Sequence, residues 1–435
     1  MTRPWAASSR KTSVGLMAAG LAIALLAGCS QPPVDVPAPL GSLSGRARLE
    51  GVYTGQGTIT LRLSGPSGEH VTQTDVRGNY TFTDIPAGTY TLSASRERYF
   101  PLSLTEVRVA PEATLPLLTL KNHRPLITLD GLYDASRLKE AEDPEFGGMV
   151  PTQSPFLTNL TLSPDGQRLA FIHGGSVKSV RLDGTDLRAE RPLPAGLQAD
   201  WVDWGETGFL LRGRTGSASA SVTLLTPQGR QDLVPAGTDE IFAPVFSPDE
   251  TQVAYVRYEA ETRSPQLMRV ASSGGAPVLM MDMLDRLNLR GIWDGTFGLM
   301  FAPLEWRPEG LMFHAPMTCN LERNGFTLGK DGIYVLRDPL APETPGGLHK
   351  AHFYSYYAHA FSNDGSRMIY AYGPEIRSKS LEDPVVTAPG ISVGHHSDEV
   401  FDSLISSRDG ERLFYLTRTG IEEMNLLPVS GNAFR

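Results

Sequence analysis

Histidine is the residue type whose spacing in this sequence most clearly suggests chemistry. Five of the nine histidines fall within 48 residues: His349, His352, His359, His395 and His396. The first three flank or precede the aromatic stretch at residues 353–357, and the last two begin the polar stretch at residues 395–399. Imidazole is a common ligand of Zn²⁺ and other transition metals. The spacing matches no compact ligand motif, so we expect packed or solvated side chains, with a polar recognition surface and a metal site as the alternatives.

The N-terminus predicts export and a lipid-modified cysteine. Three basic residues precede an apolar stretch at residues 14–26, which is too short to span a bilayer comfortably and has the flanks of a signal peptide. It ends in the sequence LAGC at residues 26–29, which resembles the lipobox of bacterial lipoproteins. The resemblance implies that residues 1–28 are removed and that Cys29 carries the lipid. The alternative is an ordinary signal peptide followed by a coincidental cysteine.

A lipid on Cys29 would place the protein in the cell envelope and anchor it to a membrane. By resemblance to Gram-negative lipoproteins, Ser30 after the cysteine is compatible with the periplasmic face of the outer membrane or the cell surface. Residues 29–40 are rich in proline and predict an extended tether. The second cysteine, Cys319, then has no disulfide partner, and we expect it to be a small buried side chain.

Composition favours short strands and excludes several classes of function. The 44 glycines and 33 prolines of the 435 residues predict frequent turns. A formal charge of −9 without a basic stripe excludes the usual footprint of a nucleic-acid binder. The motifs G-x-S-x-G and H-E-x-x-H and the P-loop do not occur. We therefore predict no catalytic residue and no cofactor, and expect a protein that is not an enzyme.

Residues 41–121 predict a small antiparallel β-sandwich. Alternating strands are separated by turn residues, and the stretches at residues 74–82 and 85–92 resemble the carboxypeptidase regulatory-like domain, a transthyretin-like sandwich. We expect Gly78 to adopt a positive φ in a hairpin turn, and Tyr80 and Tyr90 to pack across the sheets. Asp75 is expected to be a turn carboxylate, with a metal ligand as the alternative. The resemblance implies a spacer or adhesive module without catalytic residues.

Residues 122–435 predict a β-propeller of six blades. A turn motif followed by an apolar strand begins at Ser163, Ser247, Ser362 and Ser407. Degenerate copies follow Trp204 and Trp306, so the period is about 40–45 residues, as in propellers. The copies resemble the TolB-like propeller repeat, S-P-D-G-x-x-[IL]-[AV]-[FY]. The motif turn is expected to join the first two strands of each blade.

The sixth repeat ends one strand short of a blade, and an open edge invites aggregation. We predict that a segment between residues 124 and 158 supplies this strand, with residues 125–130 the best candidate. Residues 134–142 are expected to form a helix. Four tryptophans are expected in the core between blades, with an aromatic platform for a ligand as the alternative: Trp201, Trp204, Trp293 and Trp306. Six acidic residues predict a solvated face: Asp130, Asp134, Glu140, Glu142, Asp143 and Glu145.

The fold class is therefore all-β, a sandwich followed by a propeller, but propellers carry many functions. The leading hypothesis is a monomeric envelope lipoprotein whose propeller binds or scaffolds an envelope protein, a saccharide or a peptide. The alternative is a metal-dependent polysaccharide-active enzyme similar to oligogalacturonate lyases, with the five histidines at the propeller channel.

Overall fold

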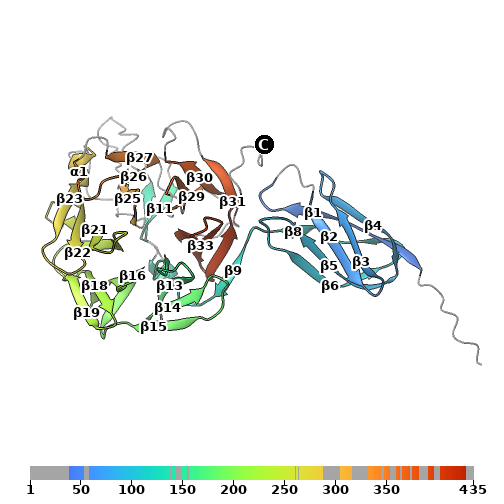
Figure 1. Ribbon diagram of the computed structural model, residues 1–435, viewed down its shortest axis with the longest axis horizontal. Coiled ribbons are helices and arrows are strands. Elements are labelled where there is room, and N and C mark those ends of the chain that lie inside the picture. The colour runs from blue at the N-terminus through green and yellow to red at the C-terminus, as the bar shows by residue number, and fades with distance from the viewer. Residues whose placement is uncertain are drawn as a thin grey trace, which may run out of the picture.

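The computed structural model describes residues 39–52, 58–137, 139–143, 148–153, 156–259, 261–262, 264–287, 304–315, 332–343, 347–352, 359–362, 365–372, 375–381, 390–395 and 402–427. A ring of small sheets lies beside a narrower sandwich (Figure 1). Within these residues the only helices are α1 (Met283–Arg286) and a 3-10 turn (Ala135–Arg137), so the predicted all-β class is confirmed. Cys29, Cys319, Trp293 and His396 lie outside the described residues.

The N-terminal sandwich consists of two sheets that pack face to face. One contains, in spatial order, β3 (Gly68–Gln73), β2 (Thr60–Gly65), β5 (Gly88–Ser95) and β6 (Leu102–Val109). The other contains β4 (Asn79–Pro86) and β1 (Leu40–Leu49), with β7 (Ala113–Thr114) and β8 (Leu118–Leu120) running parallel to β1. Alternate residues of each strand point into one shared core, as the period-two pattern predicts.

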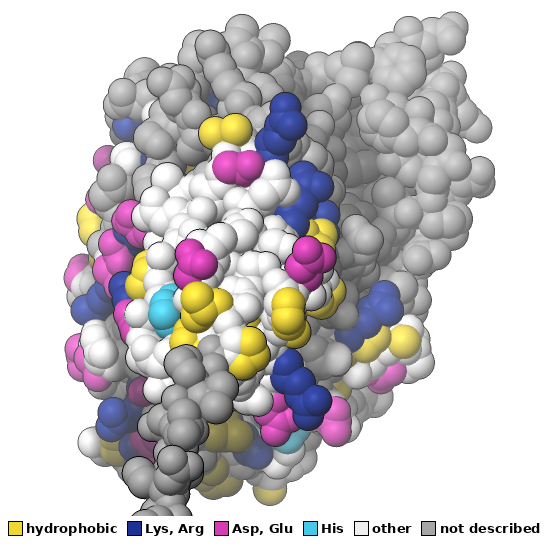
Figure 2. All heavy atoms as spheres, turned by 90° about the vertical axis from the view of Figure 1, so that its right-hand side faces the viewer, with side chains coloured by type: hydrophobic (Ala, Val, Ile, Leu, Met, Phe, Trp, Pro, Cys, Tyr) yellow, Lys and Arg dark blue, Asp and Glu magenta, His cyan; other side chains and the backbone are white. Residues whose placement is uncertain are grey.

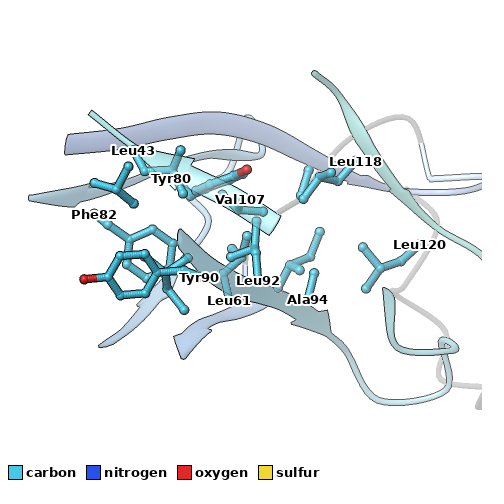
Figure 3. Packing of buried hydrophobic residues seen from close by; sticks show 14 of the residues in the cluster. Leu43, Leu61, Tyr80, Phe82, Tyr90, Leu92, Ala94, Val107, Leu118 and Leu120 are labelled. Atoms are coloured by element: carbon cyan, nitrogen blue, oxygen red, sulfur yellow. The ribbon is translucent and has the colours of Figure 1, made fainter. Parts of the chain in front are cut away.

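Tyr80 from β4 and Tyr90 from β5 both lie in this shared core between the sheets, as expected (Figure 3). The predicted hairpin around Gly78 is wrong: this glycine has a φ of 87°, but its turn joins β3 to β4, which belong to different sheets. The turn therefore crosses from one sheet to the other. The Asp75 carboxylate closes it by accepting hydrogen bonds from the backbone N–H groups of Arg77 and Asn79, both at 2.8 Å.

The described residues from His123 onward form six four-stranded antiparallel sheets and one separate hairpin. Their strands, from the innermost outward, are β12 (Thr161–Leu162), β13 (Arg168–His173), β14 (Ser176–Arg181) and β15 (Arg188–Pro192); β16 (Leu197–Gly205), β17 (Gly208–Thr215), β18 (Ser221–Thr226) and β19 (Gly229–Val234); β20 (Glu240–Phe246), β21 (Gln252–Glu259), β22 (Ser264–Ala271) and β23 (Val278–Asp282); β24 (Glu305–Arg307), β25 (Gly310–Ala315), β26 (Gly332–Leu336) and β27 (Leu348–His352); β28 (His359–Phe361), β29 (Arg367–Tyr372), β30 (Glu375–Ser380) and β31 (Ile391–His395); β32 (Asp402–Ser406), β33 (Arg412–Thr417), β34 (Gly420–Asn425) and β9 (His123–Thr128).

Six hydrophobic clusters hold these sheets together. Five clusters each join one sheet to the next along the chain. The other joins the last sheet to the first, where Phe414 of β33 packs with Phe171 of β13. The sheets therefore surround a common axis as propeller blades do. Trp201, Trp204 and Trp306 pack against these clusters, which confirms their expected place between blades.

The repeated motif forms the turn between the first two strands of a blade, as predicted. Ser163 follows β12, and its hydroxyl oxygen accepts a hydrogen bond from the backbone N–H of Arg168 at 2.9 Å while donating to Asp165. Ser247 and Ser407 make the equivalent bonds in their own blades. The hydroxyl thus satisfies backbone groups that the tight turn leaves unpaired.

The missing strand of the last blade comes from the predicted segment. Strand β9 pairs antiparallel with β34, so a segment that precedes the whole propeller closes its ring. The expected helix at residues 134–142 is wrong. Asp134 accepts bonds from the backbone N–H and the hydroxyl of Ser136, which caps a single 3-10 turn. Residues Lys139–Asp143 then form β10, which pairs with β11 (Gly148–Gln153) and overrides the helical propensity of the segment.

Candidate functional site

The two ends of the propeller differ in their connections. The six innermost strands, β12, β16, β20, β24, β28 and β32, all begin at one end, because four antiparallel strands return the chain to the side where it started. We call this end the loop face, and the opposite end, which carries the motif turns, the turn face. Each outermost strand ends at the loop face.

The three longest connections of the propeller join strand ends that lie at the loop face. They are residues 129–160, 287–304 and 316–331. The first contains the β10–β11 hairpin, whose base is fixed by a bridge between Tyr133 and Phe156 just before the innermost strand β12. In Figure 1, β11 lies within the outline of the ring. Long connections on a rigid scaffold commonly carry function, so the loop face is the candidate site.

Side chains on or next to the innermost strands link neighbouring blades. At three successive junctions, a side chain from one blade forms a hydrogen bond of 2.7–2.9 Å with the backbone of the next blade. The pairs are Ser403 with Leu160, Asn159 with Val202, and Trp201 with Pro244. These side chains position the neighbouring strands, so their polar groups are already engaged.

Asp203, on the innermost strand β16, is a partly buried carboxylate that also links neighbouring blades. It accepts hydrogen bonds from the Thr161 hydroxyl and the Phe246 backbone N–H, both at 2.9 Å, and so links three blades. Burial raises the pKa of Asp203 above its ordinary value, although these bonds oppose the shift. Glu305 has a comparable position and accepts from the Phe361 N–H at 3.0 Å. Both carboxylates are therefore structural links.

The histidines that the alternative interpretation gathers at the channel lie on three strands of two blades. His359 is on the innermost strand β28 and is buried, whereas His349 and His352 are on β27 and His395 is on β31, both outermost strands. An outermost strand lies three strand spacings, about 14 Å, from the innermost strand of its blade. Of these histidines, His352 at the end of β27, His395 at the end of β31 and His359 at the start of β28 are carried by strand ends at the loop face. Among the described side chains, no group of three or more His, Cys, Asp or Glu residues could hold a metal ion. The metal site stays the alternative to packed or solvated side chains.

A cluster that the sequence did not predict lies where the sandwich meets the propeller. His123 is 5% exposed, and its imidazole lies between two carboxylates, with Nε2 3.0 Å from Glu50 of the sandwich and Nδ1 3.1 Å from Glu422 of the propeller. Burial opposes protonation, but the hydrogen bond with Glu422 and the close charged contact with Glu50 outweigh it and raise the pKa of His123 to about 9. Glu422 is 299 residues away in sequence, so no local pattern reveals the cluster.

These observations define a two-domain all-β protein, a sandwich joined to a β-propeller. Residues 44–121 match the family model of the carboxypeptidase regulatory-like domain, which confirms the resemblance seen in the sequence. No curated protein matches the chain. Among the described residues, no helix is long and apolar enough to cross a membrane.

Several solved propellers resemble the chain at low identity. An oligogalacturonate lyase from Vibrio parahaemolyticus is 10% identical, with 70% of this chain and 93% of that chain covered and a TM-score of 0.42. A gluconolactonase from Xanthomonas campestris is 12% identical, with 62% and 85% covered and a TM-score of 0.39. TolB from Acinetobacter baumannii is 13% identical, with 61% and 62% covered and a TM-score of 0.37. The fold assignment itself rests on the strand pairing described above.

Proposed function

We propose that this protein is an envelope lipoprotein in which the lipid on Cys29 anchors the chain, the sandwich is a spacer, and the propeller binds an envelope partner through its loop face. The observation that carries the proposal is the grouping of the three longest connections at that one face. A rigid scaffold that carries its long loops at one end is the usual arrangement of a recognition surface.

The geometry of the sandwich suits a spacer. Strand β1 begins at Leu40, next to the hydrogen bond of the Ala87 N–H with the Pro39 carbonyl, and it ends at Leu49, beside β8 and the propeller joint. Ten residues of strand extend about 33 Å. The tether therefore enters at one end of the sandwich and the propeller leaves at the other. Figure 2 faces the sandwich side of the molecule, where acidic, basic and hydrophobic side chains are interspersed.

The sequence of the loop-face connections suits recognition of a partner. Residues 287–304, 316–331 and 353–358 contain the aromatic residues Trp293, Phe297, Phe301, Phe326, Phe353, Tyr354, Tyr356 and Tyr357. Aromatic side chains are enriched at protein interfaces and dominate their binding energy. An envelope protein is therefore the partner that we favour, and a saccharide or peptide is the other ligand class.

Site-specific cross-linking in intact cells tests the binding face. A photo-cross-linking residue replaces Gln198, which is exposed near the start of β16 at the loop face, or Gln228, which is exposed in a turn of the same blade at the turn face. We expect a discrete adduct from position 198 and none from position 228. An adduct from position 228 alone, or from neither position, would contradict the proposal.

A metal-dependent polysaccharide-active enzyme is the second candidate. It is favoured by the strand ends that bring the backbone of His352, His359 and His395 to the loop face. Elemental analysis of the purified protein, together with an assay of oligouronide cleavage, tests it. A stoichiometric transition metal that is lost in His352→Ala would support this candidate, and a metal-free, inactive protein would eliminate it.

A further inference from the structure

The segment that joins the two domains is also the segment that closes the propeller. Residues 121–123 connect β8 of the sandwich to β9, and β9 pairs with β34 to complete the last blade. The Lys121 carbonyl accepts a bond from the Phe100 N–H of the sandwich, and the Asn122 carbonyl accepts one from the Asn425 N–H of the propeller, both at 2.8 Å. The same short segment is thus hydrogen-bonded to both domains, next to the closing strand.

A single imidazole ties both domains to this segment. His123 is the first residue of β9, Glu50 follows β1 in the sandwich, and Glu422 lies in β34. The two carboxylates are 16% and 17% exposed, so each depends on its partners within the protein. Glu422 also accepts from the Tyr415 hydroxyl at 2.9 Å, whereas the other cation near Glu50 is Lys121 at 3.8 Å.

Other charged groups at the joint pair among themselves. Arg124 of β9 contacts Glu423 of β34 at 2.6 Å, and its guanidinium lies 4.3 Å from the centre of the Phe100 ring of the sandwich. Arg412 contacts the same Glu423 at 3.5 Å. Arg98 of the sandwich contacts Glu411 of the propeller at 2.8 Å. Both arginines near Glu423 keep their charge at any pH at which the protein folds, so they do not titrate with His123.

We propose that His123 is a protonation-dependent latch between the two domains. The protonated imidazolium contacts Glu50 of the sandwich and Glu422 of the propeller at once, and so holds the sandwich to the closing strand. Loss of the proton weakens both contacts together. A neutral imidazole has one N–H donor, so it can satisfy only one of two carboxylates that approach its two nitrogens. The other nitrogen then faces Glu50 or Glu422 with a lone pair. Charge repulsion and lost hydrogen bonding weaken the joint at the residue where β9 begins.

This inference is independent of the proposed function, because it concerns the orientation of the domains whatever the propeller binds. A closed latch fixes the direction in which the sandwich presents the propeller. An open latch makes that direction variable and exposes the edge of β34. The pKa of about 9 for His123 places the closed state at neutral pH and the opening in alkaline solution.

The test measures both consequences in the full-length chain between pH 7.5 and 10. Small-angle X-ray scattering reports the orientation of the domains. Hydrogen exchange of the β9 amides, corrected for the intrinsic effect of pH, reports ring closure. We expect both to change together in the wild type, near pH 9. In His123→Gln, both are already loosened at pH 7.5, with at least tenfold faster exchange in β9 and no further change at pH 10.

A matched control and a second variant keep the test decisive. His70 lies in the sandwich beside the ring of Tyr90, away from the joint, so His70→Gln is expected to behave as the wild type. Glu50→Gln removes one carboxylate and should lower the pH of opening by at least one unit, even if His123→Gln fails to fold. The latch is refuted if Glu50→Gln opens at the wild-type pH, if His123→Gln retains the alkaline transition, or if domain orientation and β9 exchange change separately.

Discussion

Replacing Gly420 by alanine should open the ring at its closing strand. Gly420 begins β34 after a two-residue turn and has a φ of +148°, and Gly229 begins β19 in the same way with a φ of +145°. A Cβ on Gly420 would lie 2.2 Å from the carbonyl oxygen of Ile127 and 3.0 Å from the backbone nitrogen of Leu129. A Cβ on Gly229 would meet nothing within 4 Å, because β19 is an outermost strand.

The pair separates backbone strain from the clash with β9. Either substitution strains the backbone by about 1–3 kcal/mol, because both glycines have a φ that other residues rarely adopt. At Gly420 the clashing atoms are backbone atoms, which no rotamer change can move. Strand β9 must shift, at a further cost of about 1–3 kcal/mol by analogy with overpacked cores. We therefore expect Gly420→Ala to lower the free energy of unfolding by about 2–6 kcal/mol, against about 1–3 kcal/mol for Gly229→Ala.

Urea denaturation at neutral pH measures both values, and hydrogen exchange shows where each variant loosens. We expect faster exchange in the β9 amides for Gly420→Ala only. Equal losses of stability in the two variants, with unchanged exchange in β9, would refute the role of β9 as the closing strand.

Three further predictions concern stability. The pKa of His123 in the folded protein, about 9, exceeds the ordinary value of 6.5. Protonated His123 should therefore stabilise the fold by about 3 kcal/mol below pH 6.5, and this contribution should be lost as the pH rises through 9. The free energy of unfolding from urea denaturation should differ by this amount between pH 6.5 and pH 10 in the wild type, and should not differ in His123→Gln. Asp203→Ala leaves the Thr161 hydroxyl and the Phe246 N–H without their acceptor. Urea denaturation should show that the free energy of unfolding falls by about 1–3 kcal/mol for each buried group left unpaired. A decrease under about 0.5 kcal/mol would contradict the three-blade link. Phe414→Ala creates a cavity between the last and first blades, and a loss of about 3–5 kcal/mol is expected, whereas a negligible loss would argue against a packed closing interface.

The sequence predicted the features that local patterns encode. The turn motif could be predicted because the hydroxyl of Ser163, and of each equivalent serine, forms its hydrogen bond with a backbone N–H only five residues later in the sequence. The closing strand was predictable because the last repeat lacks one strand and the segment before the first repeat is apolar and unassigned. An unpaired edge in the last blade would favour aggregation, so the segment before the first repeat was expected to pair with it.

The remaining features depend on contacts that are distant in sequence. Residues 139–143 pair with β11 instead of continuing the helix expected at residues 134–142. Helix propensity alone does not predict this pairing. The turn at Gly78 has the residues of a hairpin but joins two sheets, because β3 and β4 pair with other strands. The latch at His123 needs Glu50 and Glu422, which only the folded arrangement of two domains brings together.

Membrane anchoring and partner recognition by this protein are tested together most directly in one sample. Full-length protein with the photo-cross-linking residue at Gln198 is irradiated in cells, recovered from the membrane fraction and analysed by mass spectrometry. We expect a mature chain that begins at an acylated Cys29 and carries one discrete cross-linked partner. An unmodified Cys29 in protein from the soluble fraction, with no adduct at position 198, would contradict it.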